Sequence, residues 1–360
     1  MLIVTLALGV SATAGAQDAP QPLLTPQRLK RLQRDRERQT VRWVAFEARV
    51  QSVPESPERG FELALYYAVT HDQKRGREAV EWALKRGCDR RQFPLIVDWC
   101  RNLISEEERR KLTTSCPTAD YKPVVQSLQN GAFRDARALY AACEYLIAIS
   151  AAQHTDLRQD AAQFFSQLPV EFLLSLRPGQ INHPDWMTHV AALALVAVDP
   201  NLQASQYLQA WAIEDSQMIR EGPGVAYEFL WADPYLPGVG YQNLDPWIYD
   251  ASGRLFARTN WNADACWIAI LEKGEVEEQN CPPGWREKPA QFGQMTLIPM
   301  TTRCQELPHL ESNQRVVLWR LKPGEAVSYR DQKRQYSAQS DAAGLVLVST
   351  SAEGKVCAAR

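Results

Sequence analysis

The chain has 360 residues, a net charge of −2, 45% hydrophobic residues and 23% charged residues. These values are ordinary for a globular protein and exclude the global basic field that favours nucleic-acid binding. The length suits two domains of moderate size, and no segment beyond the first residues is apolar and long enough for a membrane helix. We therefore expect a soluble protein without a nucleic-acid partner or a membrane span.

Residues 1–16 resemble a secretory signal peptide. Leu2–Val10 is a continuous apolar run, and the sequence Ala14-Gly15-Ala16 provides a small-residue cleavage site before Gln17. Residues 17–24 then read as a flexible leader. These features predict export to the periplasm or the medium.

The eight cysteines agree with export because their number is even and no C-x-x-C pair suggests a metal site. Four lie in the first part of the chain and four in the last, which predicts disulfides within each part. A bond such as Cys281–Cys304 would contribute about 3 kcal/mol in the chain-entropy model. The alternative is that several cysteines are free and pack as small buried hydrophobes.

Residues 25–220 read as about nine or ten helices in antiparallel hairpins. Thr25-Pro26 places a cap before a proline at the first helical position, and the same device recurs at Ser56, His183 and Asp199. Two segments, 61–69 and 190–198, are apolar almost all round, so we expect them to be buried on most sides. Alternating buried and amphipathic helices are what an incomplete α/α toroid requires.

A basic run at helical spacing, RLKRLQRDRER, covers Arg28–Arg38. A run of this kind is most often the solvated face of a helix. The alternative is a face that binds a polyanion.

The segment from Glu221 to Trp261 is neither helical nor strand-like, and it is rich in Gly, Pro, Tyr and Trp. Because disordered segments are poor in aromatics, we expect residues 221–246 to form an ordered connection that lines a cleft. From 247 to 360, short runs of β-branched and aromatic residues alternate with turn signals, which predicts an antiparallel β-sandwich or sheet. The predicted class is therefore α+β.

Three stretches resemble the heparinase II/III-like and alginate-lyase group of polysaccharide lyases. They are LALYYAVTHDQKRGREAVEWAL, INHPDWMTHVAALALVAVD and YQNLDPWIYDASGRLFARTNWNADACWIAI. The last holds a strand ending in Arg258 and a Thr-x-Trp-x-x-Asp-Ala pattern. The resemblance implies β-elimination on an acidic, uronate-containing polysaccharide, without a cofactor.

Such a reaction needs a group that neutralises the uronate carboxylate, a base and an acid. Asn182 and His183 precede Pro184, so we expect them at a helix N-terminus that favours an anion, with His183 as a possible base. The alternative is that they only cap the helix. The lyase group normally has a second catalytic histidine in its β domain, and the only histidine in that part of this sequence is His309. The general base is therefore either a histidine or a tyrosine.

The aromatic connection supplies the remaining candidates. Tyr227, Tyr235 and Tyr241 are acid or base candidates, of which Tyr235 and Tyr241 complete the predicted catalytic set. We expect the substrate to contact Tyr227, Trp231, Trp247 and Arg258, with the arginine bound either to a uronate or to Asp264. The alternative for each of these aromatic side chains is a packing role, and His189 reads as a core histidine.

Two other functions fit the same sequence. A glycoside hydrolase needs two carboxylates beside the scissile bond, and five are available: Glu221, Glu228, Asp233, Asp245 and Asp250. The other is a non-catalytic exported carbohydrate-binding protein, which needs no catalytic carboxylates. No nucleotide-binding glycine motif or metal-ligand spacing is present, so we expect no cofactor and no metal.

Overall fold

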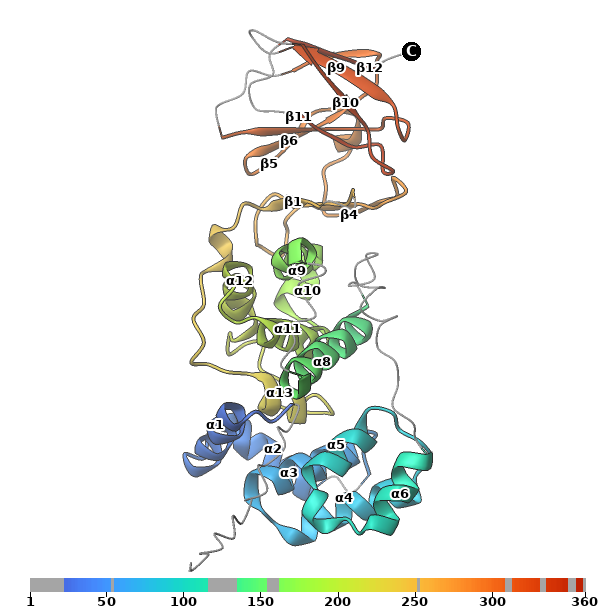
Figure 1. The fold of residues 1–360 in the computed structure, drawn as a ribbon. Coiled ribbons are helices and arrows are strands. Elements are labelled where there is room, and N and C mark those ends of the chain that lie inside the picture. Colours follow the sequence, from blue (N-terminus) through green and yellow to red (C-terminus); the bar gives the residue numbers. More distant parts are fainter. Residues whose placement is uncertain are drawn as a thin grey trace, which may run out of the picture.

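The computed structural model describes residues 23–52, 55–115, 135–153, 162–250, 253–307, 313–330, 335–348 and 354–358. Within these ranges α-helices occupy the chain as far as Trp231, and strands begin at Trp247 (Figure 1). The predicted α+β class is therefore confirmed. The predicted signal peptide and His309 lie outside the described residues.

Twelve α-helices lie in the described ranges, and together they bury one large apolar core. They are α1 (Pro26–Glu37), α2 (Val41–Ser52), α3 (Arg59–Thr70), α4 (Gln73–Lys85), α5 (Gln92–Trp99), α6 (Glu106–Ser115), α8 (Ala136–Gln153), α9 (Ala162–Ser175), α10 (Pro178–Asn182), α11 (Trp186–Val198), α12 (Gln203–Ala212) and α13 (Val225–Trp231). A 3₁₀ turn, η4 (Tyr241–Asn243), follows α13, and two others are η1 (Arg101–Leu103) and η5 (Trp285–Glu287).

Local capping sets several helix starts. The hydroxyl of Thr25 accepts a hydrogen bond from the amide of Arg28 at 3.3 Å, so α1 begins at Pro26 as predicted. Before α6, Ser105 and Glu108 each accept a hydrogen bond from the other's backbone amide, which is the predicted capping box. The apolar helices α3 and α11 are buried on most of their surface, as expected.

Five local predictions are wrong. The segment that begins at Glu221 is not free of helix, because it contains α13. The proline after Ser56 does not open a helix, because α3 begins at Arg59. Leu23 and Leu24 pack into the helical core, with exposed fractions of 0% and 1%, so these two residues are no flexible leader. The proline after Asp199 does not open a helix, because α12 begins at Gln203. The proline after His183 does not open one either, because Asp185 caps α11.

The strands form three four-stranded sheets. The inner sheet has the order β1-β2-β3-β4, the middle sheet β11-β8-β6-β5 and the outer sheet β10-β9-β12-β7. Their bounds are β1 (Trp247–Tyr249), β2 (Leu255–Arg258), β3 (Trp267–Ile270), β4 (Val276–Gln279), β5 (Ala290–Phe292), β6 (Met295–Pro299), β7 (Cys304–Glu306), β8 (Arg315–Trp319), β9 (Ala326–Arg330), β10 (Gln335–Gln339), β11 (Val346–Val348) and β12 (Lys355–Ala358).

The helices and the sheets are stacked in layers along the molecule (Figure 1). Side chains alternate across each strand, so the central strands of the inner and middle sheets contribute to two cores. On β2, Phe256 faces the helical core, whereas Leu255 and Ala257 face the middle sheet. On β8, Val317 faces the inner sheet and Val316 packs towards the outer one.

Not every strand pair is antiparallel, which corrects the sequence prediction. β6 and β8 run parallel, with Leu297 opposite Val317. Between them the chain forms β7, which belongs to the outer sheet. Because the chain leaves the middle sheet and returns to it by a crossover, β8 can re-enter in the same direction as β6.

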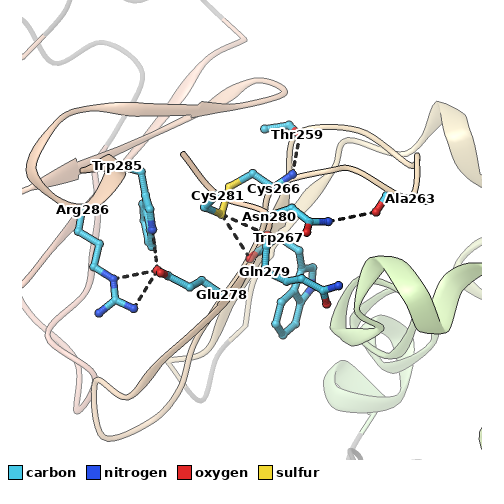
Figure 2. Close-up of a disulfide and its surroundings, with 10 residues drawn as sticks. All are labelled: Thr259, Ala263, Cys266, Trp267, Glu278, Gln279, Asn280, Cys281, Trp285 and Arg286. Carbon is cyan, nitrogen blue, oxygen red and sulfur yellow. Dashed lines mark hydrogen bonds and ion pairs between the residues drawn. A yellow bond between two sulfur atoms is a disulfide. The ribbon is translucent and has the colours of Figure 1, made fainter. Parts of the chain in front are cut away.

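Two disulfides join cysteines of the β part. Cys266 bonds Cys281 beside the inner sheet (Figure 2), and Cys304 bonds Cys357 between β7 and β12. The suggested bond between Cys281 and Cys304 is therefore wrong, because each of these cysteines has another partner. In the helical part Cys88 is disulfide-bonded, whereas two others are free and buried, namely Cys100 and Cys143.

Candidate functional site

Four arginines lie along one side of α1, the last of them at its C-cap. Arg28, Arg31, Arg34 and Arg38 follow one another at intervals of three or four residues, which places their side chains on the same side of a helix. Leu32, four residues after Arg28, borders this face and is fully buried in the helical core. The basic run is therefore more than a uniformly solvated face, since Arg31 is only 5% exposed.

A tight turn after α13 faces these arginines. The amide of Leu236 donates to the carbonyl of Asp233 at 3.2 Å, and Pro234 occupies the second position of the turn. An Asp-Pro pair favours such a turn, because the proline ring presets φ. The carboxylate of Asp233 also accepts from the amide of Tyr235 at 3.1 Å. The turn presents Tyr235 outwards, with 64% of its surface exposed.

Arg31 joins α1 to the end of α13. Its guanidinium donates to the carbonyls of Leu230 and Ala232, the first at 2.6 Å, and lies 3.6 Å from the carboxylate of Asp233. The last carbonyls of a helix lack partners within the helix and carry partial negative charge, so a cation is favoured there. Arg31 is therefore a structural residue that anchors the turn.

Arg28 lies flat against an indole. Its guanidinium carbon is 4.5 Å from the ring centroid of Trp231, a cation–π contact, and its Nη1 donates to the carbonyl of Leu23. Burial, and then the positive charge of Arg31, lower the pKa of Arg28 to about 10. The guanidinium of Arg28 stays charged at neutral pH, and an additional negative charge beside it would stabilise this charged form.

The turn and the helix enclose a pocket of about 480 Å³, which we call the arginine pocket. This volume is in the range of small-ligand sites. Arg38 donates to the hydroxyl oxygen of Tyr235 at 3.1 Å across the rim. The lining consists of Thr25, Gln27, Arg28, Arg31, Arg34, Arg38, Ala197, Pro200, Trp231, Asp233, Tyr235 and Leu236.

Charge and shape define what the arginine pocket can bind. Its lining holds four arginines and a single carboxylate, and that carboxylate pairs with Arg31. Exposed Arg34 and Arg38 are thus available to a ligand, together with the ring of Tyr235. Guanidinium groups bind carboxylates and sulfates with two parallel hydrogen bonds, and aromatic rings stack on sugars. The pocket is chemically suited to an anionic, ring-containing ligand.

Of the eight residues predicted from the sequence, Trp231 and Tyr235 line this pocket. Asn182 and His183 do not. They lie at the C-terminal end of α10, where the Asn182 side chain donates to the carbonyl of Pro178 at 3.1 Å. Their expected place at a helix N-terminus is wrong because Asp185, and not His183, accepts the first amides of α11.

Tyr227 lies one turn before Trp231 on α13 but is only 1% exposed. Its hydroxyl donates to Glu58 at 2.5 Å, and Arg91 stacks over its ring and pairs with the same carboxylate. Burial raises the pKa of Tyr227 well above its usual value. This geometry suits a structural hydrogen bond within the helical core.

Tyr241 and Arg258 meet at the junction of the helices and the inner sheet, where both contact Trp261. Burial, followed by the nearby Glu214, raises the pKa of Tyr241, which disfavours the phenolate that a base requires. Trp247 lies on β1 and packs into the core between the inner and middle sheets. Its indole nitrogen donates to Asp245 at 2.8 Å.

The carboxylates considered for hydrolysis are also dispersed. Only Asp233 lines the arginine pocket. Glu228 is buried between His189 and Arg42, at 3.0 and 2.7 Å, so His189 has the partner expected of a core histidine. Among the described residues no group of three or more His, Cys, Asp or Glu side chains is placed as metal ligands are.

From the sequence, a polyanion-binding face on residues 28–38 was only the alternative to a solvated one, and none of its arginines was among the predicted site residues. The signal was the spacing of arginines at three or four residues beside the apolar Leu29 and Leu32. What spacing could not reveal is the partner surface, because Asp233 lies about 200 positions further along the chain than Arg31.

Comparison with protein-family models and with curated protein sequences found no match for this chain. None of the helices that the structure describes combines the length and the apolar character needed to cross a membrane.

Proposed function

We propose that this protein binds an acidic saccharide in the arginine pocket. The observation that carries the proposal is the convergence of exposed Arg34 and Arg38 with the ring of Tyr235 over a floor of Trp231 and Arg28. The guanidinium groups supply hydrogen bonds to carboxylates or sulfates. The aromatic rings supply apolar faces for the sugar rings.

The exposed arginines are expected to contribute most of the selectivity for acidic over neutral saccharides. Arg34 has an exposed guanidinium with no neighbouring carboxylate in the pocket, because Asp233 pairs with Arg31. A hydrogen bond to a charged group contributes about 1.5–3 kcal/mol. Loss of one such arginine should therefore weaken binding of an acidic ligand roughly tenfold to a hundredfold.

Isothermal titration of the folded protein with uronate oligosaccharides, and with neutral oligosaccharides of the same length, tests this proposal. We expect binding of the uronates only, and a loss of affinity in Arg34→Gln and Arg38→Gln. Lys30→Gln is the matched control, because Lys30 is exposed on the same helix but does not line the pocket. Equal affinity for neutral and acidic saccharides would overturn the proposal, as would full affinity in the double arginine variant.

A second candidate function is β-elimination on the bound uronate, and the position of Tyr235 favours it. Arg38 donates to the hydroxyl oxygen of Tyr235, and a hydrogen bond from a cation favours the phenolate that a base requires. In the proposed reaction, Tyr235 as phenolate removes the proton from C5 of the uronate. The electron pair of the C5–H bond forms the C4–C5 double bond as the C4–O bond breaks, and the same tyrosine gives its proton to the leaving oxygen.

The two candidates are distinguished by a Tyr235→Phe variant. If the protein is a lyase, this variant binds uronate oligosaccharides but no longer forms the ultraviolet-absorbing unsaturated product. Wild-type protein that binds uronates without forming this product has no lyase activity on them. A hydrolase receives no support from the pocket, since hydrolysis needs two carboxylates and only Asp233 is present.

We further propose that the helical part is an incomplete α/α toroid, that the middle and outer sheets form a sandwich, and that the protein acts in the periplasm or the medium. Face-to-face packing of the two sheets around one apolar core supports the sandwich. The disulfides Cys266–Cys281 and Cys304–Cys357 support an oxidising compartment. Detection of the mature protein outside the cytoplasm, with these bonds intact, tests the location.

A further inference from the structure

Arg258 is a buried cation at the junction of the helices and the inner sheet. It ends β2 on the face that carries Phe256, and none of its surface is exposed. Its Nε donates to the carbonyl of Asn260 at 2.9 Å. Within the described part of the chain, its two terminal nitrogens, Nη1 and Nη2, have no hydrogen-bond acceptor.

The charges around Arg258 do not compensate it. Burial lowers the pKa of Arg258 to about 10, and the one opposing influence is that of Tyr241. Asp264, which the sequence suggested as a partner, is exposed to solvent. A buried guanidinium without an anion is costly, by several kcal/mol on general grounds.

Trp261 adds a third unsatisfied donor to the same place. The guanidinium carbon of Arg258 lies 4.5 Å from the ring centroid of Trp261. The indole Nε1 of Trp261 is buried and, among the described residues, has no acceptor. Tyr241 packs edge-on against this indole at 5.1 Å. Among the described residues, these three donors therefore have no acceptor, whereas the nearby carboxylate of Glu214 interacts with the hydroxyl of Tyr241.

The loop that carries Trp261 is held in place from its other side. Asn280 donates to the carbonyl of Ala263 at 3.1 Å, and the amide of Cys266 donates to the hydroxyl of Thr259 at 3.2 Å (Figure 2). The disulfide from Cys266 to Cys281 lies directly beside these contacts. Trp261 is thus positioned over Arg258 by a fixed loop, although its neighbours in the loop are exposed.

We propose that Arg258 and Trp261 form a binding site for a small organic carboxylate. A planar carboxylate presents two oxygens to Nη1 and Nη2 and matches the fork of the guanidinium. The aromatic rings of Trp261 and Tyr241 favour an organic anion over a strongly hydrated inorganic one. This site is separate from the arginine pocket, which none of these residues lines.

The occupied site would link the two parts of the molecule. Arg258 and Trp261 belong to β2 and the loop after it, whereas Tyr241 lies in η4, which packs against α12. A carboxylate bound here stabilises the folded state because the unfolded chain has no such site. Thermal stability is therefore a direct readout of occupancy.

The test compares thermal unfolding of the whole protein in sodium acetate and in sodium chloride at equal ionic strength. We expect acetate to raise the Tm saturably, by about 3 °C at a concentration about tenfold above its Kd. Arg258→Met should abolish this increment, and Trp261→Phe should reduce it while keeping an aromatic ring. Arg34→Gln/Arg38→Gln is the control for the arginine pocket and should keep the full increment.

Two results would overturn the proposal. The first is an equal Tm in acetate and chloride for the wild-type protein, because the three donors then do not bind a carboxylate. The second is a loss of uronate oligosaccharide affinity in Arg258→Met, because the cluster would then belong to the saccharide site. If Arg258→Met does not fold, Trp261→Phe gives the same decision from a milder change.

Discussion

Arg31 allows the most decisive test of the structure, because two arginines of the same helix face have different expected roles. Arg31 is 5% exposed and donates to the carbonyls of Leu230 and Ala232, whereas Arg34 is exposed. We consider the substitution Arg31→Met, which keeps the length and apolar stem of the side chain. It removes both hydrogen bonds and leaves Asp233 without its cation.

The expected loss follows from these contacts. Each of the two hydrogen bonds from the buried guanidinium contributes about 1.5–3 kcal/mol, and Asp233, which is 27% exposed, adds little, so we expect a loss of about 3–5 kcal/mol. For a domain of this size, the corresponding fall in Tm is roughly 10 °C. Arg34→Met should change the free energy of unfolding by no more than about 0.5 kcal/mol.

Urea unfolding followed by far-ultraviolet circular dichroism measures both variants. Stability of Arg31→Met within about 1 kcal/mol of the wild type would refute the assignment of Arg31 as the anchor of the turn. An equal loss in Arg34→Met would refute it as well, because the effect would then be a property of the whole basic face.

Three further measurements test other parts of the fold. Burial and the neighbouring Asp250 raise the pKa of Glu171 from 4.5 to about 8. The contribution of this residue to stability is therefore complete below about pH 4.5 and is lost as the pH rises through 8. Glu171→Gln should make the Tm less dependent on pH between these values, and an unchanged pH dependence would contradict the burial of Glu171. Replacing Cys266 and Cys281 by alanine opens a link across 15 residues and should lower the free energy of unfolding by about 3 kcal/mol in urea titrations, whereas unaltered stability would argue against the bond. Burial raises the pKa of Cys100 to about 12, so iodoacetamide should modify it only after unfolding, and rapid labelling of the native protein would contradict its position.

Several features of the fold could be predicted from the sequence because their causes are local. The hydroxyl of Thr25 and the pair of Ser105 and Glu108 satisfy amides no more than three residues away, so each helix start is visible in a few letters. The alternation on β2 likewise assigns Phe256 and Leu255 to opposite faces. The order of helices before strands follows from the same short-range patterns.

The candidate sites depended on contacts that no local pattern encodes. Arg31 and Ala232 are 201 positions apart, and only the packing of α1 against the end of α13 brings them together. The same holds for the disulfides, where spacing alone did not show that Cys304 pairs with Cys357 rather than with Cys281. A capping residue or a strand alternation is determined by neighbours within one turn or two. A pocket, by contrast, is determined by which surfaces the whole chain must bury against each other, and that choice is made only when the core forms.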